Sequence, residues 1–258
     1  MNDTMILAET SSLAERADAL EHRMMQELDC IIVKSRLFNL ADGDDTMPNG
    51  PALMAQNPGK RMLMGDDPRL PKMPEKPTLT DFFKYRFAPA AHLLQSAKHA
   101  MTAGMSEKVV LASLLHDIGV IGFIRSDHGY WGAQMVEPYV DEEVAWAIRA
   151  HQALRFYADE SVGYSYPESY IKYFGEDYRP DPYIEDEYKR ALNHKWYMTA
   201  RMITVHDIYS FDPTMIVTID EFEDVIGRNF RQPEEGLGND SSASAHMWRT
   251  LMRPTKYL

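Results

Sequence analysis

The chain has 258 residues, 45% of them hydrophobic, which is enough for one large domain or one domain plus an extension. Its 39 acidic residues outnumber its 27 basic ones, and the resulting net charge of −12 argues against partners such as nucleic acid and anionic membranes. A single cysteine excludes an intramolecular disulfide, no apolar run reaches the roughly 20 residues of a membrane helix, and the N-terminus lacks a secretory signal pattern, so we expect a cytoplasmic protein.

Residues 1–79 are expected to form an N-terminal extension. Apolar residues at helical spacing predict an amphipathic helix over residues 9–39, which could pack on its own core or on a partner subunit in a homo-oligomer. Residues 41–79 are rich in proline and break this pattern. They are interpreted as a long loop over the domain surface, with a disordered linker as the alternative.

Residues 80–258 are expected to form an all-helical domain. Thr80 and Asp81 can cap its first helix, and further helices are predicted over residues 89–104, 106–119, 128–138, 141–157, 184–210 and 219–230. Ser106 and Asp220 are the predicted caps of two of these helices. Residues 160–183, rich in Tyr, Pro and Gly, are predicted to be a long loop, and residues 215–218 are the only strand candidate.

A histidine and an aspartate stand side by side at an apolar helix end, in Leu114-Leu115-His116-Asp117-Ile118-Gly119. Burying an aspartate there costs free energy unless the charge is paired or bound to a metal. For this dipeptide alone, a hydrogen bond between the two side chains at the helix end is the preferred interpretation over a metal site. The positions of the other histidines favour the metal site.

Five segments resemble the HD-domain superfamily, namely residues 92–97, 110–119, 127–133, 144–157 and 204–207. They are especially similar to its oxidative branch, which includes phosphonate-cleaving diiron oxygenases and, more distantly, myo-inositol oxygenase. The segments follow one another in the family's order, and the resemblance covers about residues 85–230. It implies an all-α HD-domain helical bundle and a metalloenzyme.

The resemblance also implies a set of metal ligands: His92, His116, Asp117, His128, His151 and Asp207. A carboxylate can bridge two cations and a neutral imidazole cannot, so Asp117 is the best candidate for the bridge. His116 and Asp117 are accordingly expected to be catalytic. Imidazole and carboxylate ligands suit iron, manganese and zinc. Two iron ions (Fe²⁺/Fe³⁺) are the expected cofactors, with Mn²⁺ or Zn²⁺ as the alternative.

By the same resemblance, His92, His116 and Asp207 would hold the first metal, while His128 and His151 would hold the second. This division leaves open positions for a small-molecule substrate and for dioxygen, which are the expected partners.

Three further residues are expected near the metals. Arg155 comes one helical turn after His151 and would bind an anionic substrate group; a surface ion pair is the alternative. Tyr85 precedes His92 by seven residues, and the resemblance suggests that a side chain in this region covers a metal position. Both are expected to be catalytic and substrate-binding. His99 would line the substrate site or lie at the solvent edge.

The sequence departs from the oxygenase branch at two places that bear on the substrate. Val120 stands where many members have a lysine or histidine. Residues 164–183 are aromatic and longer than the Ser/Thr-rich loop with a Gln-Gly-Gly turn found in the phosphonate oxygenases. The phosphonate contacts do not carry over, so the substrate is expected to differ and to have apolar or aromatic character.

The expected function is a diiron oxygenase that activates dioxygen and cleaves or hydroxylates a small polar substrate, organophosphonate-like or hydroxylated. The alternative is a metal-dependent phosphohydrolase acting on a nucleotide or phosphate ester, because the same ligand set would serve it. A non-enzymatic helical binding protein with a degraded site is the third interpretation, and the intact ligand set argues against it.

Overall fold

The computed structural model describes residues 71–87, 90–119, 127–168, 170–171, 175–208, 210, 212 and 214–252. Within these ranges the regular elements are all helical, as expected, and strand pairing is limited to one isolated bridge between Asp159 and Tyr164. The predicted helix over residues 9–39 and most of the predicted loop lie outside the described residues. None of the described helices has both the length and the apolar character needed to span a bilayer.

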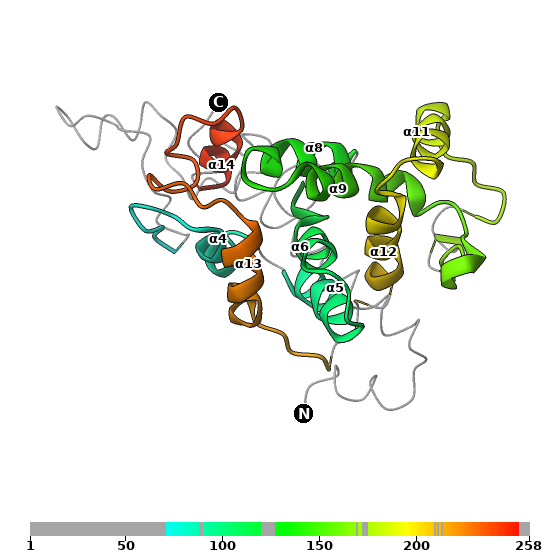
Figure 1. The fold of residues 1–258 in the computed structure, drawn as a ribbon, viewed down its shortest axis with the longest axis horizontal. Helices are drawn as coiled ribbons and strands as arrows, with labels where there is room; N and C mark the ends of the chain where they lie inside the picture. Colours follow the sequence, from blue (N-terminus) through cyan, green and yellow to red (C-terminus); the bar gives the residue numbers. More distant parts are fainter. Residues whose placement is uncertain are drawn as a thin grey trace, which may run out of the picture.

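Five helices form the centre of the bundle (Figure 1): α5 (Ala91–Thr102), α6 (Glu107–Leu115), α8 (His128–Val136), α9 (Glu142–Leu154) and α12 (Tyr197–Asp207). The remaining α-helices lie around them: α4 (Leu79–Tyr85), α11 (Pro182–Leu192), α13 (Glu223–Asn229) and α14 (Ala245–Met252). The central helices pack on one another through fully buried side chains such as Leu93, Leu111, Leu114, Ile148 and Ile203. This apolar core fixes the relative positions of the helix ends.

The helix starts agree with the prediction at one cap and differ at two. Ser106 caps α6 as predicted, because its side chain accepts a hydrogen bond from the backbone N–H of Val109. The cap of α4 is Thr78, which forms a reciprocal capping box with Asp81. The 3-10 helix Ile219–Phe222, which leads into α13, has Thr218 as its N-cap. Asp220 lies inside this helix and is not its cap.

The predicted helix over residues 184–210 is wrong, because two helices, α11 and α12, occupy this stretch. They are separated at Asn193, the C-cap of α11, and His194 in the break stacks on Trp146 of α9 with ring centroids 3.8 Å apart. The break lets α11 pack on α9 while α12 packs on α5 and α6 as well. A single straight helix could not make both sets of contacts.

Some helix lengths and the strand candidate are also corrected, and one helix was not expected. The helices predicted over residues 106–119, 128–138 and 141–157 are shorter than expected, ending as α-helices at Leu115, Val136 and Leu154. Residues 215–218 form no strand. Helix α14 was not predicted; its Trp248 is fully buried, packs edge-on against Phe82 at 4.8 Å and donates its indole N–H to the carbonyl of Met135.

Candidate metal centre

The ends of the five central helices bring six buried histidine and aspartate side chains together: His92, His116, Asp117, His128, His151 and Asp207. None of the six is more than 8% exposed. They come from α5, the residues just after α6, the first position of α8, the last turn of α9 and the end of α12. All six predicted ligands therefore lie in one cluster, and their role as ligands remains a prediction.

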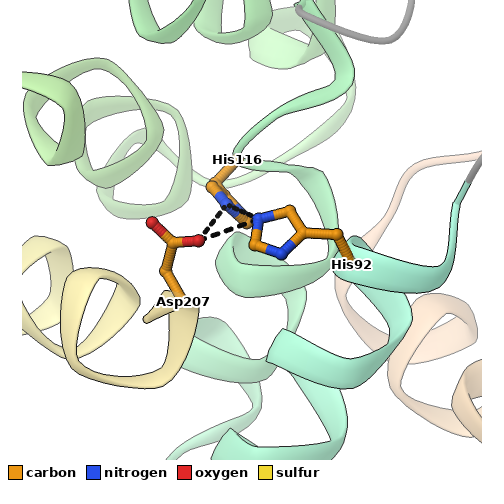
Figure 2. Close-up of side chains that lie close together, drawn as sticks. All are labelled: His92, His116 and Asp207. Carbon is orange, nitrogen blue, oxygen red and sulfur yellow. Dashed lines mark hydrogen bonds and ion pairs between the residues drawn. The ribbon is translucent and has the colours of Figure 1, made fainter. Parts of the chain in front are cut away.

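The first part of the cluster consists of His92, His116 and Asp207 (Figure 2). The Nε2 atom of His92 lies 3.2 Å from Nε2 of His116 and 2.8 Å from Oδ1 of Asp207. The same carboxylate oxygen is 3.6 Å from Nε2 of His116. Three potential ligand atoms thus converge on one point, as a metal site requires.

The second part of the cluster is built on Asp117, which faces two pairs of histidines. Its Oδ1 lies 3.1 Å from Nε2 of His128 and 3.3 Å from Nε2 of His151, which are themselves 3.2 Å apart. Its Oδ2 lies 3.6 Å from Nε2 of His116 and 3.7 Å from Nε2 of His92. One carboxylate therefore presents a different oxygen to each pair.

Backbone carbonyls orient three of the imidazole rings. The Nδ1 atoms of His92, His116 and His151 lie 3.3, 2.7 and 2.5 Å from the carbonyl oxygens of Ser210, Ser113 and Ile148. A ring nitrogen that faces a carbonyl must donate, so the proton of the neutral imidazole is on Nδ1. The lone pair of Nε2 then points into the cluster, which is the tautomer that metal-binding histidines adopt.

The donor set fits a cation better than it fits an empty protein interior. Oδ1 of Asp117 and Oδ1 of Asp207 are buried and have no hydrogen-bond partner. Lone pairs on neighbouring imidazoles face these oxygens, and lone pairs repel one another unless a proton or a metal ion lies between them. The buried histidines and aspartates could therefore hold a metal ion.

The ionisation of the carboxylates and of one imidazole also suits metal binding. Burial raises the pKa of Asp117, but the neighbouring His116 and His128 outweigh it and hold the pKa well below its ordinary value. For Asp207, burial is likewise outweighed by Arg155 and His92, so its pKa is also well below the ordinary value. Burial lowers the pKa of His151 to about 4, so this imidazole is neutral at pH 7.

His116 is the exception, and it leads to a prediction about protons. Burial lowers its pKa, but Asp117 and Asp207 outweigh burial and the net pKa lies above the ordinary value. A metal ion must displace this proton, so binding should release protons wherever His116 is protonated and should weaken as the pH falls. Titration calorimetry in two buffers of different ionisation enthalpy measures the release; identical binding enthalpies in both buffers would contradict it.

Glycines allow α8 to approach its neighbours closely enough to deliver His128. A Cβ atom on Gly119 would lie 2.6 Å from the backbone oxygen of His128, and one on Gly129 would lie 3.0 Å from the backbone oxygens of Ile148 and Arg149. Real Cβ atoms essentially never show a contact of 2.6 Å, and 3.0 Å is tighter than nine in ten real Cβ contacts, so α8 would have to move.

We therefore expect Gly119→Ala to weaken metal binding through His128 by roughly tenfold or more, an effect in the range of lost supporting contacts around metal ligands. Competition with a chelating dye measures the affinity. The matched control is Gly227→Ala on α13, where an added Cβ meets nothing within 4 Å. Equal metal affinity in the two variants would show that the close approach of α8 is not needed.

Arg155 lies at the cluster, on the face predicted from its spacing to His151. Its Nε is 3.6 Å from Oδ2 of Asp207, and one terminal nitrogen is 3.4 Å from Nε2 of His128. The guanidinium also lies over the ring of Tyr170, 5.1 Å from its centroid. Its side chain is 18% exposed. Arg155 thus touches both parts of the cluster and still reaches solvent.

The structure places Tyr85 at the surface, and its predicted role at the metals stays a prediction. It is 37% exposed and lines a surface cavity with residues such as Met73, Asn239 and Met252. His99 is half-buried in the last turn of α5. The pKa of His206 is lowered first by the burial of His206 itself and second by the charge of His99. The predicted role of His99 in substrate binding remains a prediction.

Two residues that support Arg155 were missed by the sequence analysis. Arg201 is fully buried and donates to the carbonyls of Leu154 and Tyr157 at 3.0 and 3.1 Å, while the Tyr164 hydroxyl donates to the carbonyl of Arg155 at 2.8 Å. Together they hold the chain on both sides of Arg155. A single arginine within the apolar stretch 200–205 was the signal that could have revealed Arg201.

Comparison with known families agrees with this arrangement. Residues 90–186 match the family model described as HD domain. This stretch of the chain is therefore similar to HD domains. The HD-domain match contains five of the six clustered residues, and Asp207 follows it in α12. A comparison with curated proteins gives no match.

Proposed function

We propose that this chain is a dinuclear HD-domain metalloenzyme, and specifically a diiron oxygenase that hydroxylates or cleaves a small polar substrate. The observation that carries the proposal is the carboxylate of Asp117. Its Oδ1 faces His128 and His151, and its Oδ2 faces His116 and His92. A carboxylate placed in this way between two pairs of imidazoles can hold two cations side by side.

In this proposal each residue has a defined part. His92, His116 and Asp207 would hold one iron, and His128 and His151 the other, with Asp117 shared between them. When bound, the two irons would supply Lewis acidity and one-electron redox chemistry. Arg155 would bind and orient an anionic group of the substrate, because its guanidinium lies at both parts of the cluster and reaches solvent.

The ligand set is compatible with iron, and one observation favours oxidation. The ligand set is rich in imidazole, with four histidines for two carboxylates, and imidazole suits iron as well as zinc. The segments that resemble the oxygenase branch include residues 127–133 and 144–157, which contribute His128 and His151. The structure brings these two residues within hydrogen-bond distance of Asp117.

A phosphohydrolase is the alternative, since the same cluster together with Arg155 could bind a phosphate ester. The two functions are separated by one experiment on protein purified without oxygen and loaded with Fe²⁺ or Mn²⁺. The oxygenase is expected to consume oxygen with a small organophosphonate or hydroxylated compound, and not to hydrolyse bis-nitrophenyl phosphate. Hydrolysis of this ester without oxygen uptake would reject the oxygenase and support the alternative.

A further inference from the structure

A second cavity, of about 320 Å³, is lined by residues of α8, α9 and α11 and by Asp127, the N-cap of α8, and α9 packs on both other helices. This volume is in the range of small-molecule sites. Three aromatic rings line it and are partly exposed: Tyr130 at 42%, Trp131 at 38% and Tyr183 at 49%. None of the six clustered histidines and aspartates lines this cavity. It is therefore a site apart from the candidate metal centre.

Among the described residues that line the cavity, the acidic side chains outnumber the basic ones. Asp127 and Glu187 contribute two carboxylates against one guanidinium, that of Arg149. The Tyr183 hydroxyl donates to Oδ1 of Asp127 at 2.7 Å, so this carboxylate faces the aromatic wall. The described lining thus combines aromatic rings with two carboxylates, of which Glu187 also accepts from Arg190 at 2.8 Å. Ring faces and carboxylates both attract cations.

One planar cation of the chain itself, the guanidinium of Arg149, already contacts an aromatic ring and a carboxylate of this cavity. This guanidinium lies over the ring of Tyr130, 5.0 Å from the centroid, and 3.8 Å from a carboxylate oxygen of Glu187. Tyr130 and Trp131 meet edge to face at 5.5 Å, which keeps the two rings in defined orientations. Trp131 and Tyr183 remain partly exposed, and the Tyr183 hydroxyl contacts the Asp127 carboxylate.

We propose that this cavity binds a small planar aromatic cation, such as an amidine or a protonated heterocycle. The ring of the ligand would lie against the exposed faces of Trp131 and Tyr183, and its positive charge would point toward Asp127 and Glu187. The inference goes beyond the proposed function and does not require bound metals. A result at this cavity is therefore separable from a result at the metal centre.

Three probes of the same shape and different charge test the proposal: benzamidine, benzamide and benzoate. Titration calorimetry on the full metal-free chain should show that benzamidine binds at least roughly tenfold more tightly than benzamide, and that benzoate binds most weakly. Equal affinities, preference for benzoate, or no benzamidine binding at millimolar concentration would overturn the proposal.

Variants locate the binding of benzamidine. Glu187→Gln and Trp131→Ala should each weaken it several-fold, while Glu185→Gln should leave it unchanged. Glu185 is the matched control because it lies on the same helix and pairs with Lys189 at 2.7 Å, and it does not line the cavity. Benzamidine affinity that is the same in Glu187→Gln, Trp131→Ala and the wild type would place the ligand elsewhere and reject the site.

Discussion

Asp117→Asn is expected to lower the metal content of the chain from about two ions to one or none. An amide is neutral, and only its oxygen can bind a metal, so it cannot present one anionic oxygen to His128 and His151 and another to His92 and His116. The volume of the side chain hardly changes, so the loss reports on charge and ligation. Mass spectrometry of the metals in protein purified without oxygen provides the measurement.

The control for this variant is Asp186→Asn, an exposed position on α11. It removes the same charge from the chain without touching the cluster and should keep the full metal content. If the Asp117→Asn variant still binds two ions with wild-type affinity, Asp117 does not bridge the two metals. A fall in metal content shared by both variants would point instead to the net charge of the protein.

Arg155→Ala is expected to keep the metals and to weaken the binding of an anion at the cluster by roughly 10- to 100-fold, which corresponds to about 1.5–3 kcal/mol for hydrogen bonds to a charged group. The guanidinium is the one cation seen to touch both Asp207 and His128 among the described residues. Inorganic phosphate and methylphosphonate are suitable probes, and titration calorimetry on the metal-loaded chain measures their binding.

The matched control is Arg149→Ala, which removes an arginine from the same helix, α9, but from the side that faces the second cavity. It should leave anion binding at the metal centre unchanged. Loss of the metals in Arg155→Ala would show that Arg155 supports the cluster and does not act on the substrate. Equal anion affinity in the two variants would show that Arg155 forms a structural ion pair and does not bind the anion.

The cluster could be predicted from sequence because its six residues lie in short segments that resemble the HD-domain superfamily. His116-Asp117 closes an apolar helix, and the other segments follow in the order of the family. The structure adds what no linear pattern contains, namely that the two oxygens of Asp117 face different pairs of histidines. Such a division depends on side-chain orientation and on the packing of five helices.

Tyr85 shows where the spacing argument fails. Seven residues separate it from His92, which would put both on one face of a continuous helix. However, α4 ends at Tyr85 and α5 begins at Ala91, so the two residues belong to different helices and the helical period does not connect them. The prediction of one helix over residues 184–210 was wrong for a similar reason. The apolar periodicity of this stretch does not reveal the break between α11 and α12 near Asn193.

Helix α14 and the cap at Thr218 were missed for related reasons. Trp248 is fully buried because α4 and α8 supply its contacts, and those helices are distant in sequence. Near Thr218, two acidic residues compete as helix-start signals, and the deciding contact is the backbone N–H of Thr218 donating to Glu221. Local sequence propensity predicts the start of a helix to within a residue or two, and the capping hydrogen bonds determine the residue at which it begins.

Electron paramagnetic resonance of the iron-loaded chain after partial oxidation is the most direct test of a shared metal pair. Two irons that share the carboxylate of Asp117 should couple magnetically and give the signal of a half-oxidised pair, and Asp117→Asn should abolish that signal. Only an uncoupled signal from isolated Fe³⁺ in the wild type would contradict the dinuclear centre.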